Sequence, residues 1–248
     1  MTTELLPLAG RRALITGASA GIGAAIARAF HRAGATCVLH GRDQSRLEQV
    51  AADLDARIIV ADLTDRDAPQ RVGAEAAKLG GLDIVVNNAG FEVDATVAEL
   101  GSDLFAALLE VNLIAPVALL RECLSALRAS GAASVINITS IHESVPVAGN
   151  GGYAAARAGL ASLTRTASVE LGPDGIRLDS IARGVIATSM NRDKIAEVGE
   201  DRFAEWIPLG YVADVDDVAD VAVTWRASPR GTSQERPSSS TVGIATTS

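Results

Sequence analysis

The residues best suited to chemistry form a glycine-rich turn near the start of the chain, Thr16-Gly17-Ala18-Ser19-Ala20-Gly21-Ile22-Gly23. The turn follows a short apolar run and opens a segment with helical periodicity. Gly17 permits a tight turn, Gly21 lets a pyrophosphate approach the backbone, and Gly23 lets the helix pack closely. The helix N-terminus adds free N–H groups and a positive dipole end. The pattern therefore predicts a dinucleotide-binding turn, with a purely structural glycine turn as the alternative.

The end of the second apolar run indicates which dinucleotide is bound. NAD sites often place an acidic residue about 20 residues beyond the turn, where it holds the ribose 2′-hydroxyl. Here that strand ends Leu39-His40-Gly41-Arg42, and Asp43 comes late enough to cap the next helix. Arg42 is able to neutralise a 2′-phosphate with a bidentate fork. We therefore predict NADP(H), with NAD(H) as the alternative; a solvated surface charge is the other explanation of Arg42.

Strands and helices must alternate to position these residues. We expect strands at residues 13–16, 36–39, 57–60, 83–86, 134–138 and 177–181. We expect helices at residues 21–33, 43–54, 65–80, 104–130, 153–171, 191–206 and 216–226, with Asp43 and either Thr64 or Asp65 as caps and a bend near Pro116. This order predicts one α/β domain over residues 1–228, a Rossmann-type doubly wound parallel sheet in three layers.

Composition argues against several classes of protein. The chain has 248 residues and a net charge of −8, without the basic stripe of a nucleic-acid binder or a polybasic membrane anchor. Its start, MTTELLPLAGRR, lacks a signal-peptide core, and no run approaches the ~20 apolar residues of a membrane span. Cys37 and Cys123 form no CxxC pair, so we expect buried thiols and no metal site. The expected location is the cytoplasm.

The C-terminal stretch differs from the rest of the chain. Residues 229–248 are polar and rich in Ser and Thr, which is typical of a disordered terminus. Such a tail is not expected to supply a buried strand, so the sixth strand is predicted to be an exposed edge. Six strands are therefore expected, with a seventh in doubt.

Further motifs follow the glycine turn in a fixed order: Asp62-Leu63, Asn87-Asn88-Ala89-Gly90, Asn112, Ser140, Tyr153 and Gly184 to Thr188. Over residues 8 to about 228 the chain resembles the short-chain dehydrogenase/reductase family. The resemblance implies that Asp62 and Leu63 hold the adenine ring and that Ile186 and Thr188 hold the nicotinamide. It also implies that Asn88, Ala89 and Gly90 lie against the cofactor.

The resemblance implies a reaction as well. Hydride would move between the nicotinamide and a carbonyl or secondary alcohol, while Tyr153 exchanges a proton with the substrate oxygen. A tyrosine can do this only if its pKa falls from about 10, and a fixed cation lowers that pKa by favouring the phenolate. Ser140 would hydrogen-bond the substrate oxygen, and Asn112 would position a water that relays the proton. An ordinary half-buried tyrosine is the alternative for Tyr153.

The chain departs from the family pattern at the cation. The family has YxxxK, whereas this chain has Tyr153-Ala154-Ala155-Ala156-Arg157, which still places both side chains on one helix face. Arg157 is expected to lower the pKa of Tyr153, but to hold the cofactor ribose poorly and slow the enzyme. Arg183 replaces a family proline, and Arg226 replaces an apolar helix residue. A nucleotide-binding homologue with impaired catalysis is therefore the alternative to a working enzyme.

These departures also suggest an altered coding sequence. Each of the three arginines lies one possible base change from the family residue, and the tail lacks the family's seventh-strand motif. A back-translation from Thr232 onward, read from its third base, encodes VTGATVVVDGGYSNN. We therefore hypothesise a frameshift between about Ala227 and Thr232, which the mass of the C-terminal peptide would test.

The segment Ser140-Ile141-His142-Glu143 gives a hint of the substrate. It is similar to the SxHE of the family's glucose 1-dehydrogenases, which favours a sugar or polyol contacted by His142 and Glu143. For His142 and Glu143, the alternative is that they are loop residues facing water. For the substrate, the alternative is a 3-oxoacyl thioester, which the net negative charge of the chain mildly disfavours. The resemblance implies a homo-oligomer, a dimer or tetramer. The altered tail puts the tetramer in doubt.

Overall fold

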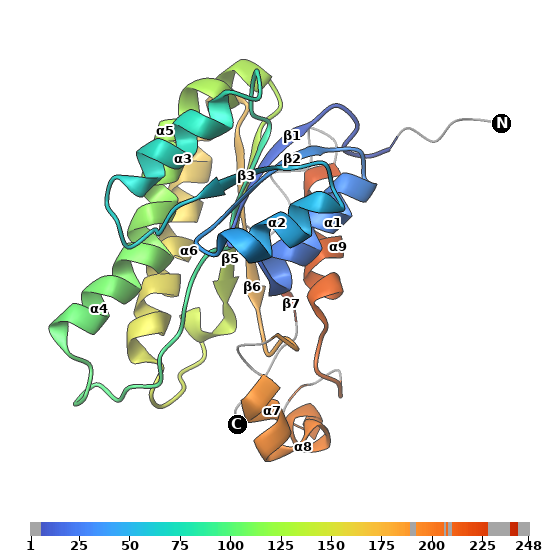
Figure 1. The fold of residues 1–248 in the computed structure, drawn as a ribbon. Coiled ribbons are helices and arrows are strands. Elements are labelled where there is room, and N and C mark those ends of the chain that lie inside the picture. Colours follow the sequence, from blue (N-terminus) through green and yellow to red (C-terminus); the bar gives the residue numbers. More distant parts are fainter. Residues whose placement is uncertain (1–5, 189–191, 206, 208–209, 228–238, 243–248) are drawn as a thin grey trace.

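The computed structural model describes residues 6–188, 192–205, 207, 210–227 and 239–242. In this part of the chain the strands form one parallel sheet in the order β3-β2-β1-β4-β5-β6-β7 (Figure 1). The strands are β1 Arg12–Thr16, β2 Thr36–Gly41, β3 Arg57–Val60, β4 Ile84–Asn87, β5 Ser134–Ser140, β6 Arg177–Arg183 and β7 Ser239–Val242. The order reverses between β1 and β4, which is where α/β folds of this kind bind nucleotides.

Helices cover both faces of the sheet, as the predicted three-layer Rossmann-type fold requires (Figure 1). One face carries α1 (Gly21–Arg32), α2 (Gln44–Ala52) and α9 (Val215–Ala227), with α1 and α9 in contact. The other carries α3 (Ala68–Ala77), α5 (Ala115–Ser130) and α6 (Gly151–Leu171). The short helices α7 (Arg192–Val198) and α8 (Glu200–Glu205) lie together at one end of the molecule.

The central strands are buried because both faces of the sheet are covered. Every residue of β4 and β5 is buried, and so is all of β1 after Arg12. On the α1 side, Ile22, Ile26 and Phe30 recur at helical spacing and pack into the core. Small aliphatic side chains thus fill both layers and hold the strand ends in register.

Several predicted boundaries are confirmed and others shift. β3 matches its expected range, and Asp43 caps α2 by accepting a hydrogen bond from the backbone N–H of Arg46 at 3.1 Å. The predicted cap of α3 is wrong. Asp65 instead accepts a hydrogen bond from the backbone N–H of Asp67, which is itself the N-cap residue, and α3 begins three residues later than expected.

The helix expected over residues 104–130 is present from Ser102 to Ser130, but it is not α-helical throughout. It begins as α4 (Ser102–Leu109), widens into the π-helical turn η1 (Glu110–Ile114) and continues as α5. Pro116 sits in the first turn of α5, where its missing N–H costs least. The irregular turn therefore lies just before the predicted bend, and it contains Asn112.

The same segment corrects the expectation that no run is apolar enough for a membrane span. Ser102–Ser130 meets that criterion by length and composition, and 33% of its most apolar window is buried. A core helix of a soluble protein meets it equally, and here α5 packs against α3, β4 and β5.

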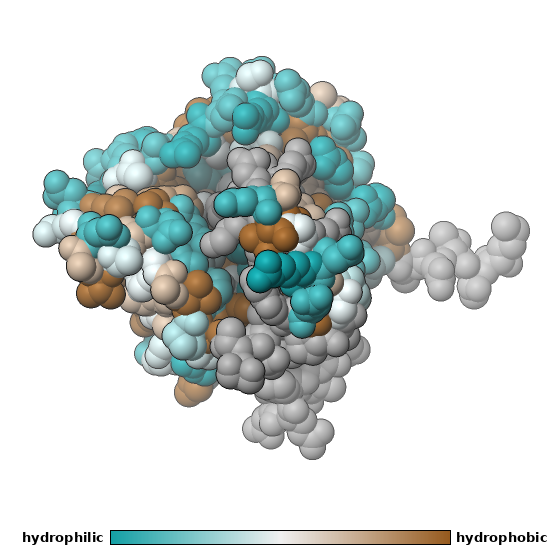
Figure 2. Space-filling view, turned by 90° about the horizontal axis from the view of Figure 1, so that it is seen from below, coloured by the Kyte–Doolittle hydropathy of each residue, from teal (hydrophilic) through white to brown (hydrophobic). Residues whose placement is uncertain are grey.

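At the end of the molecule that carries α7 and α8, hydrophobic residues are scattered among hydrophilic ones (Figure 2).

The expectation that β6 forms an exposed edge is wrong for the described chain. β7 pairs with β6 in parallel, with Ser180 opposite Ser239 and Arg183 opposite Val242. Strand pairing uses backbone N–H and C=O groups, so a polar sequence is able to extend a sheet. Residues 228–238 and 243–248 lie outside the described residues, and so does most of the stretch on which the frameshift hypothesis rests.

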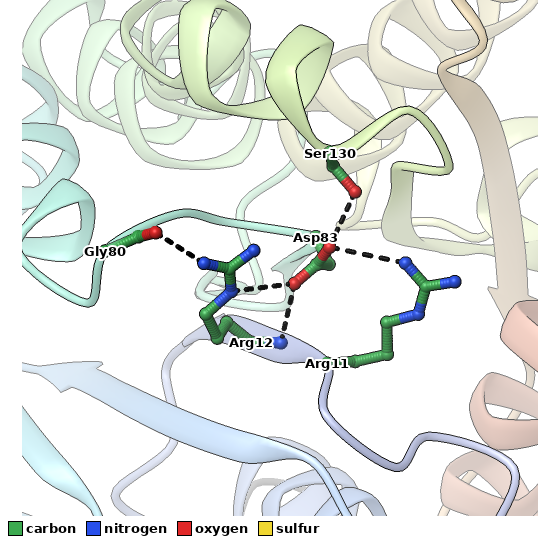
Figure 3. A network of polar contacts seen from close by, with 5 residues as sticks. All are labelled: Arg11, Arg12, Gly80, Asp83 and Ser130. Carbon is green, nitrogen blue, oxygen red and sulfur yellow. Dashed lines mark hydrogen bonds and ion pairs between the residues drawn. The ribbon is translucent and has the colours of Figure 1, made fainter.

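A polar network joins the ends of β1, β4 and α5 opposite the cleft (Figure 3). The carboxylate of Asp83 accepts hydrogen bonds from the Arg12 side chain at 2.9 Å, the Arg12 backbone at 3.0 Å and the Ser130 hydroxyl at 2.6 Å. Arg11 adds a bond at 3.3 Å. Burial alone would raise the pKa of Asp83, but these donors outweigh it and lower the pKa to about 2.

Candidate active site

The glycine turn has the geometry that the spacing predicts. Gly17 and Gly21 have φ of +64° and +54°, a region that glycine enters without steric cost. A Cβ on Gly17 would lie 2.8 Å from the Cα of Ala89, and one on Gly23 would overlap the carbonyl oxygen of Gly17. Glycine is therefore needed for the close packing of the backbone between β1 and α1, which forms a cradle beside the segment after β4.

Hydrogen bonds join the segment after β4 to this cradle. The amide of Asn88 donates to the carbonyl oxygens of Thr16 at 2.9 Å and Gly17 at 3.1 Å. The hydroxyl of Thr16 in turn accepts from the backbone N–H groups of Asn88 and Ala89, at 3.0 and 3.1 Å. Asn88 thus fixes the two loops relative to each other, a structural role besides any contact with a cofactor.

A cleft of about 340 Å³ runs from the glycine turn to α6. Most of the residues predicted to bind the cofactor line it: Gly17, Ser19, Gly21, Ile22, Arg42, Asp62, Leu63, Asn88, Ala89, Gly90, Tyr153, Arg157 and Thr188. Gly23 lies beneath the turn, and Ile186 is buried in a bridge to Ala213. Among the described residues, no three His, Cys, Asp or Glu side chains gather as a metal ion would need.

One end of the cleft carries the residues expected to select the dinucleotide. The guanidinium of Arg42 is 76% exposed and lies 4.0 Å from the carboxylate of Asp62. Hydrogen bonds from Thr64 lower the pKa of Asp62, so this carboxylate is charged at neutral pH. His40 also lines the cleft, and burial lowers its pKa to about 4, which leaves it neutral. Arg42 is thus an exposed cation at this end of the cleft.

The other end centres on Tyr153 of α6, whose side chain is buried. Arg183, the last residue of β6, donates a hydrogen bond from Nη2 to the hydroxyl of Tyr153 at 3.0 Å. The guanidinium carbons of Arg157 and Arg183 lie 5.3 and 5.9 Å from the centre of its ring. Burial alone would raise the pKa of Tyr153, but the two guanidiniums outweigh it and lower the pKa.

Arg157 is a buried cation that the described residues leave partly unsatisfied. Its exposed fraction is 3%, and its Nε and Nη1 have no hydrogen-bond partner within the described chain. Its Nη2 occupies the space that a Cβ on Gly90 would need. Leaving buried N–H groups unpaired is costly, so these groups indicate a bound partner in the cleft. Together with the open glycine cradle, they fit a dinucleotide.

Ser140 and Asn112 are both buried, and neither belongs to the described lining of the cleft. Ser140 ends β5 directly opposite Arg183 of β6, and its hydroxyl accepts from the backbone N–H of His142 at 3.3 Å. The amide of Asn112 exchanges hydrogen bonds with the backbone N–H and C=O of Phe91, at 3.2 and 3.0 Å. Asn112 therefore holds the loop after β4 in place.

The structure does not bring the predicted substrate residues into the cleft. His142 and Glu143 lie in the short helix η2 (Ile141–Glu143), which packs on α6. The ring of His142 lies 3.4 Å from the carbonyl oxygen of Val145, and burial raises the pKa of Glu143. Both side chains are half-buried beside the site.

Two residues at the site were not among the predicted site residues. Arg183 stood out in the sequence only as a departure from a family proline. Glu92 carried no sequence signal, yet its carboxylate lies 4.0 Å from Arg183 and accepts a hydrogen bond from Asn150 at 2.7 Å. Only the parallel pairing of β5 and β6 brings Arg183 to the tyrosine.

Comparison with known proteins gives consistent matches over most of the chain. The family model described as short chain dehydrogenase matches residues 11–199. Nodulation protein G of Rhizobium sp. (strain N33) is 36% identical over 230 residues, 90% of this chain and 92% of that protein. The structure of a 3-oxoacyl (acyl-carrier-protein) reductase from Agrobacterium tumefaciens with NADP bound is 28% identical, with a TM-score of 0.84 and 90% of each chain covered.

A putative NAD(P)-dependent gluconate 5-dehydrogenase from Beutenbergia cavernae is similar over a longer stretch. Its structure, with NADP bound at low occupancy, has a TM-score of 0.86 and 30% identity, with 96% of each chain covered.

Proposed function

Because the chain belongs to the short-chain dehydrogenase family, and is an NAD(P)-dependent oxidoreductase acting on CH–OH groups, we propose that its cleft holds NADP(H) and that Tyr153 is its acid–base group. The single observation that carries this proposal is the arrangement at the two ends of one cleft. An open glycine turn and Arg42 lie at one end, and a tyrosine flanked by two cations lies at the other.

The residues of the cleft have separate tasks in holding the dinucleotide. The N–H groups of the turn Gly17–Gly23 receive the pyrophosphate at the start of α1. Arg42 pairs with the 2′-phosphate, and Asp62 and Leu63 lie at the adenine end. Asn88, Ala89, Gly90, Ile186 and Thr188 complete the nicotinamide end, where the unsatisfied N–H groups of Arg157 face the ribose. The bound cofactor supplies or accepts the hydride.

The proton moves through side chains of this chain. Tyr153 gives its hydroxyl proton to the substrate oxygen in reduction and takes it back in oxidation. The cations of Arg157 and Arg183 lower the pKa of Tyr153 and so favour its phenolate. Ser140 hydrogen-bonds the same substrate oxygen, and Asn112 positions the relay water and the loop after β4.

A binding titration tests the cofactor assignment without a known substrate. Purified protein is titrated with NADPH and then with NADH, and energy transfer from Trp206 and Trp225 to the reduced nicotinamide is followed. We expect tight binding of NADPH and weak binding of NADH. Binding of neither would refute the assignment for this polypeptide, and equal binding would refute the role of Arg42.

The substrate is proposed to be a small carbonyl compound or secondary alcohol, with a sugar, polyol or sugar acid favoured. The resemblance of Ser140 to Glu143 to sugar dehydrogenases supports this choice, as does the name of the gluconate 5-dehydrogenase relative. A 3-oxoacyl thioester is the second candidate, supported by the name of the Agrobacterium relative. Gluconate with NADP⁺, against acetoacetyl-CoA with NADPH, separates the two.

The remaining alternative is a homologue that binds the dinucleotide but turns over slowly because Arg157 replaces a lysine. A turnover rate equal to that of the Arg157→Lys variant, with gluconate or acetoacetyl-CoA as substrate, decides against it. We further propose a cytoplasmic homo-oligomer, a dimer or a tetramer.

A further inference from the structure

Arg183 lies where the ends of two strands and a helix meet. It is the last residue of β6, and the parallel register places it directly opposite Ser140 of β5. Its side chain is 12% exposed and reaches the hydroxyl of Tyr153 on α6, with Nη2 and Oη 3.0 Å apart. Arg183 therefore donates a hydrogen bond to the group that Tyr153 would use in catalysis.

We propose that Arg183 is a second catalytic cation: it holds the hydroxyl of Tyr153, directs its proton toward the substrate and stabilises the oxygen once that proton has left. This inference rests on the proposed function of Tyr153 as the acid–base group.

The hydrogen-bonding capacity of the two groups gives the direction of the proton. A phenol has one donor and acceptor lone pairs, whereas a guanidinium only donates. The N–H of Arg183 therefore fills an acceptor position of Tyr153 and leaves the hydroxyl proton for another acceptor. Since Ser140 lies beside Arg183 in the register, the substrate oxygen that Ser140 binds is the acceptor at that place.

The proton step then balances within the site. In reduction the O–H bond of Tyr153 breaks, and an O–H bond forms on the substrate oxygen as the carbonyl carbon receives a hydride. The electron pair of the broken bond stays on the phenolic oxygen, 3.0 Å from the Nη2 of Arg183. A charge-assisted hydrogen bond from a fixed donor is strongest at this point, so it stabilises the charged state most.

Arg157 does not make this role redundant. Its guanidinium carbon lies 5.3 Å from the centre of the Tyr153 ring, and its Nη2 packs against Gly90. Arg157 lowers the pKa of Tyr153 through its charge and a side-chain hydrogen bond. Arg183 adds a second hydrogen bond to the reacting oxygen, which lies 3.0 Å from its Nη2. Glu92, held by Asn150, lies 4.0 Å from Arg183 and counters part of its charge.

The other charged groups near α6 have no direct part in this pair. Besides Arg183, the elements that pack on α6 carry Asp103 on α4, Glu110 on η1, His142 and Glu143 on η2, Asp174 on η3 (Gly172–Asp174), and Arg177 and Asp179 on β6. The pKa of Tyr153 responds to burial, to Arg157 and Arg183, and in the opposite sense to Glu92. Replacing Arg183 should therefore change the pH at which Tyr153 titrates.

The composition of the chain makes that titration specific. It contains two tyrosines, Tyr153 and the exposed Tyr211. In a Tyr211→Phe background, the near-ultraviolet absorbance of the phenolate reports Tyr153 alone, without cofactor or substrate. We expect Arg183→Gln and Arg183→Met to move this titration to higher pH. Arg177→Met removes an arginine from the other end of β6 and is expected to leave it in place.

Kinetics provide the second readout. With NADP(H) and whichever of gluconate or acetoacetyl-CoA is turned over, Arg183→Gln is expected to lower kcat about tenfold or more, with little change in the KM for the dinucleotide. The pH at which the oxidation rate reaches half its maximum should rise with the titration of Tyr153. A purely structural role for Arg183 would lower the folded fraction without moving that pH.

The outcomes separate this inference from the proposed function. If Tyr153 titrates at the same pH in both Arg183 variants, or kcat is unchanged, the catalytic role of Arg183 is wrong even in an active enzyme. If neither variant folds, Arg157→Met carries the test, because Arg183 alone should still hold the titration of Tyr153 below its ordinary pH. A return to that ordinary pH would overturn the inference. If the titration of Tyr153 moves as expected but the protein binds no dinucleotide, the proposed function is wrong, while the interaction of Arg183 with Tyr153 still holds.

Discussion

At the scale of single residues, the lysine-to-arginine difference at position 157 has the most direct consequence. Arginine keeps the charge, but its planar fork does not reproduce a compact ammonium at the ribose. We expect Arg157→Lys to raise kcat about tenfold, because one charge-assisted hydrogen bond is worth roughly 1.5–3 kcal/mol. Steady-state kinetics with NADP(H) check this. Arg165→Lys, an exposed change on the same helix, is the control, and unchanged turnover in Arg157→Lys would show that the ribose contact is already adequate.

Arg42 is the residue on which the choice of dinucleotide depends. Its side chain is largely exposed, so its loss should leave the fold intact. We expect Arg42→Ala to weaken NADPH binding about tenfold, since one contact to a 2′-phosphate is lost, and to leave NADH binding unchanged. Fluorescence titrations give both dissociation constants. Arg46→Ala removes a comparably exposed arginine on α2 and should affect neither. Equal weakening of both dinucleotides would mean that Arg42 acts on a shared group instead.

Sequence reasoning at this scale succeeded where a local pattern fixes the backbone. The glycine turn could be predicted because positive φ and close packing require glycine at defined spacings. Arg183 and Glu92 could not be assigned to the site in this way. Their positions depend on the register of β5 against β6 and on the path of the loop after β4, and neither leaves a local signal.

At the scale of elements, Asp83 couples β1, β4 and α5 through a buried carboxylate. Its pKa is about 2 in the folded chain against 3.8 normally, so its stabilisation is present above pH 4 and is lost as the pH falls through about 2. We expect Asp83→Asn to lower the free energy of unfolding by about 2 kcal/mol at pH 7.

Urea denaturation at pH 7 and at pH 3 measures this effect. The difference between Asp83→Asn and the parent should shrink at pH 3, because this carboxyl then binds a proton in the unfolded parent but stays charged in the folded one. Asp65→Asn, which removes an exposed carboxylate paired with Arg71, is the control and should show little change. A difference that stays constant with pH would show that the charge of Asp83 is not what stabilises the fold.

The π-helical turn η1 links an element boundary to the cleft through Asn112. Its amide satisfies both backbone groups of Phe91 and donates to the carbonyl oxygen of Leu108 at 2.9 Å. We expect Asn112→Ala to cost roughly 1–3 kcal/mol of stability, because buried polar groups lose their partners, and to weaken dinucleotide binding. Urea denaturation and the fluorescence titration check the two effects. Asn112→Asp keeps the acceptor but brings a buried carboxylate against the carbonyl oxygens of Phe91 and Leu108, so it should also destabilise the protein. An Asn112→Ala variant as stable as the parent would contradict the role of Asn112 in holding the loop.

Helices and strands could be predicted where apolar periodicity defines them, and less well where turn residues define their ends. The alternation of runs gave every strand through β6, because a parallel sheet covered on both faces needs continuous apolar segments. The start of α3 was misplaced because Asp62, Asp65 and Asp67 all suit turns and caps. β7 was not expected, since its pairing with β6 uses backbone groups that polarity patterns do not report.

At the scale of the whole molecule, the apolar surface of the α4–η1–α5 segment bears on assembly. Ile114 and Val117 remain 47% and 38% exposed, three residues apart and thus on one side of the segment. Exposed apolar side chains on a helix are stabilised when a second surface covers them. We therefore expect this side to lie in the contact between copies of the proposed homo-oligomer.

The double variant Ile114→Glu and Val117→Glu tests this arrangement. It places two charges in the expected contact, where burying them unpaired is costly, so the molar mass should fall toward that of one chain. Light scattering after size-exclusion chromatography measures the mass, and Val97→Glu, at an 84% exposed position before α4, should leave it unchanged. An unchanged mass in the double variant would place the contact elsewhere. A monomeric parent that sediments with lipid vesicles would instead assign this apolar side to a membrane, which the composition of Ser102–Ser130 by itself permits.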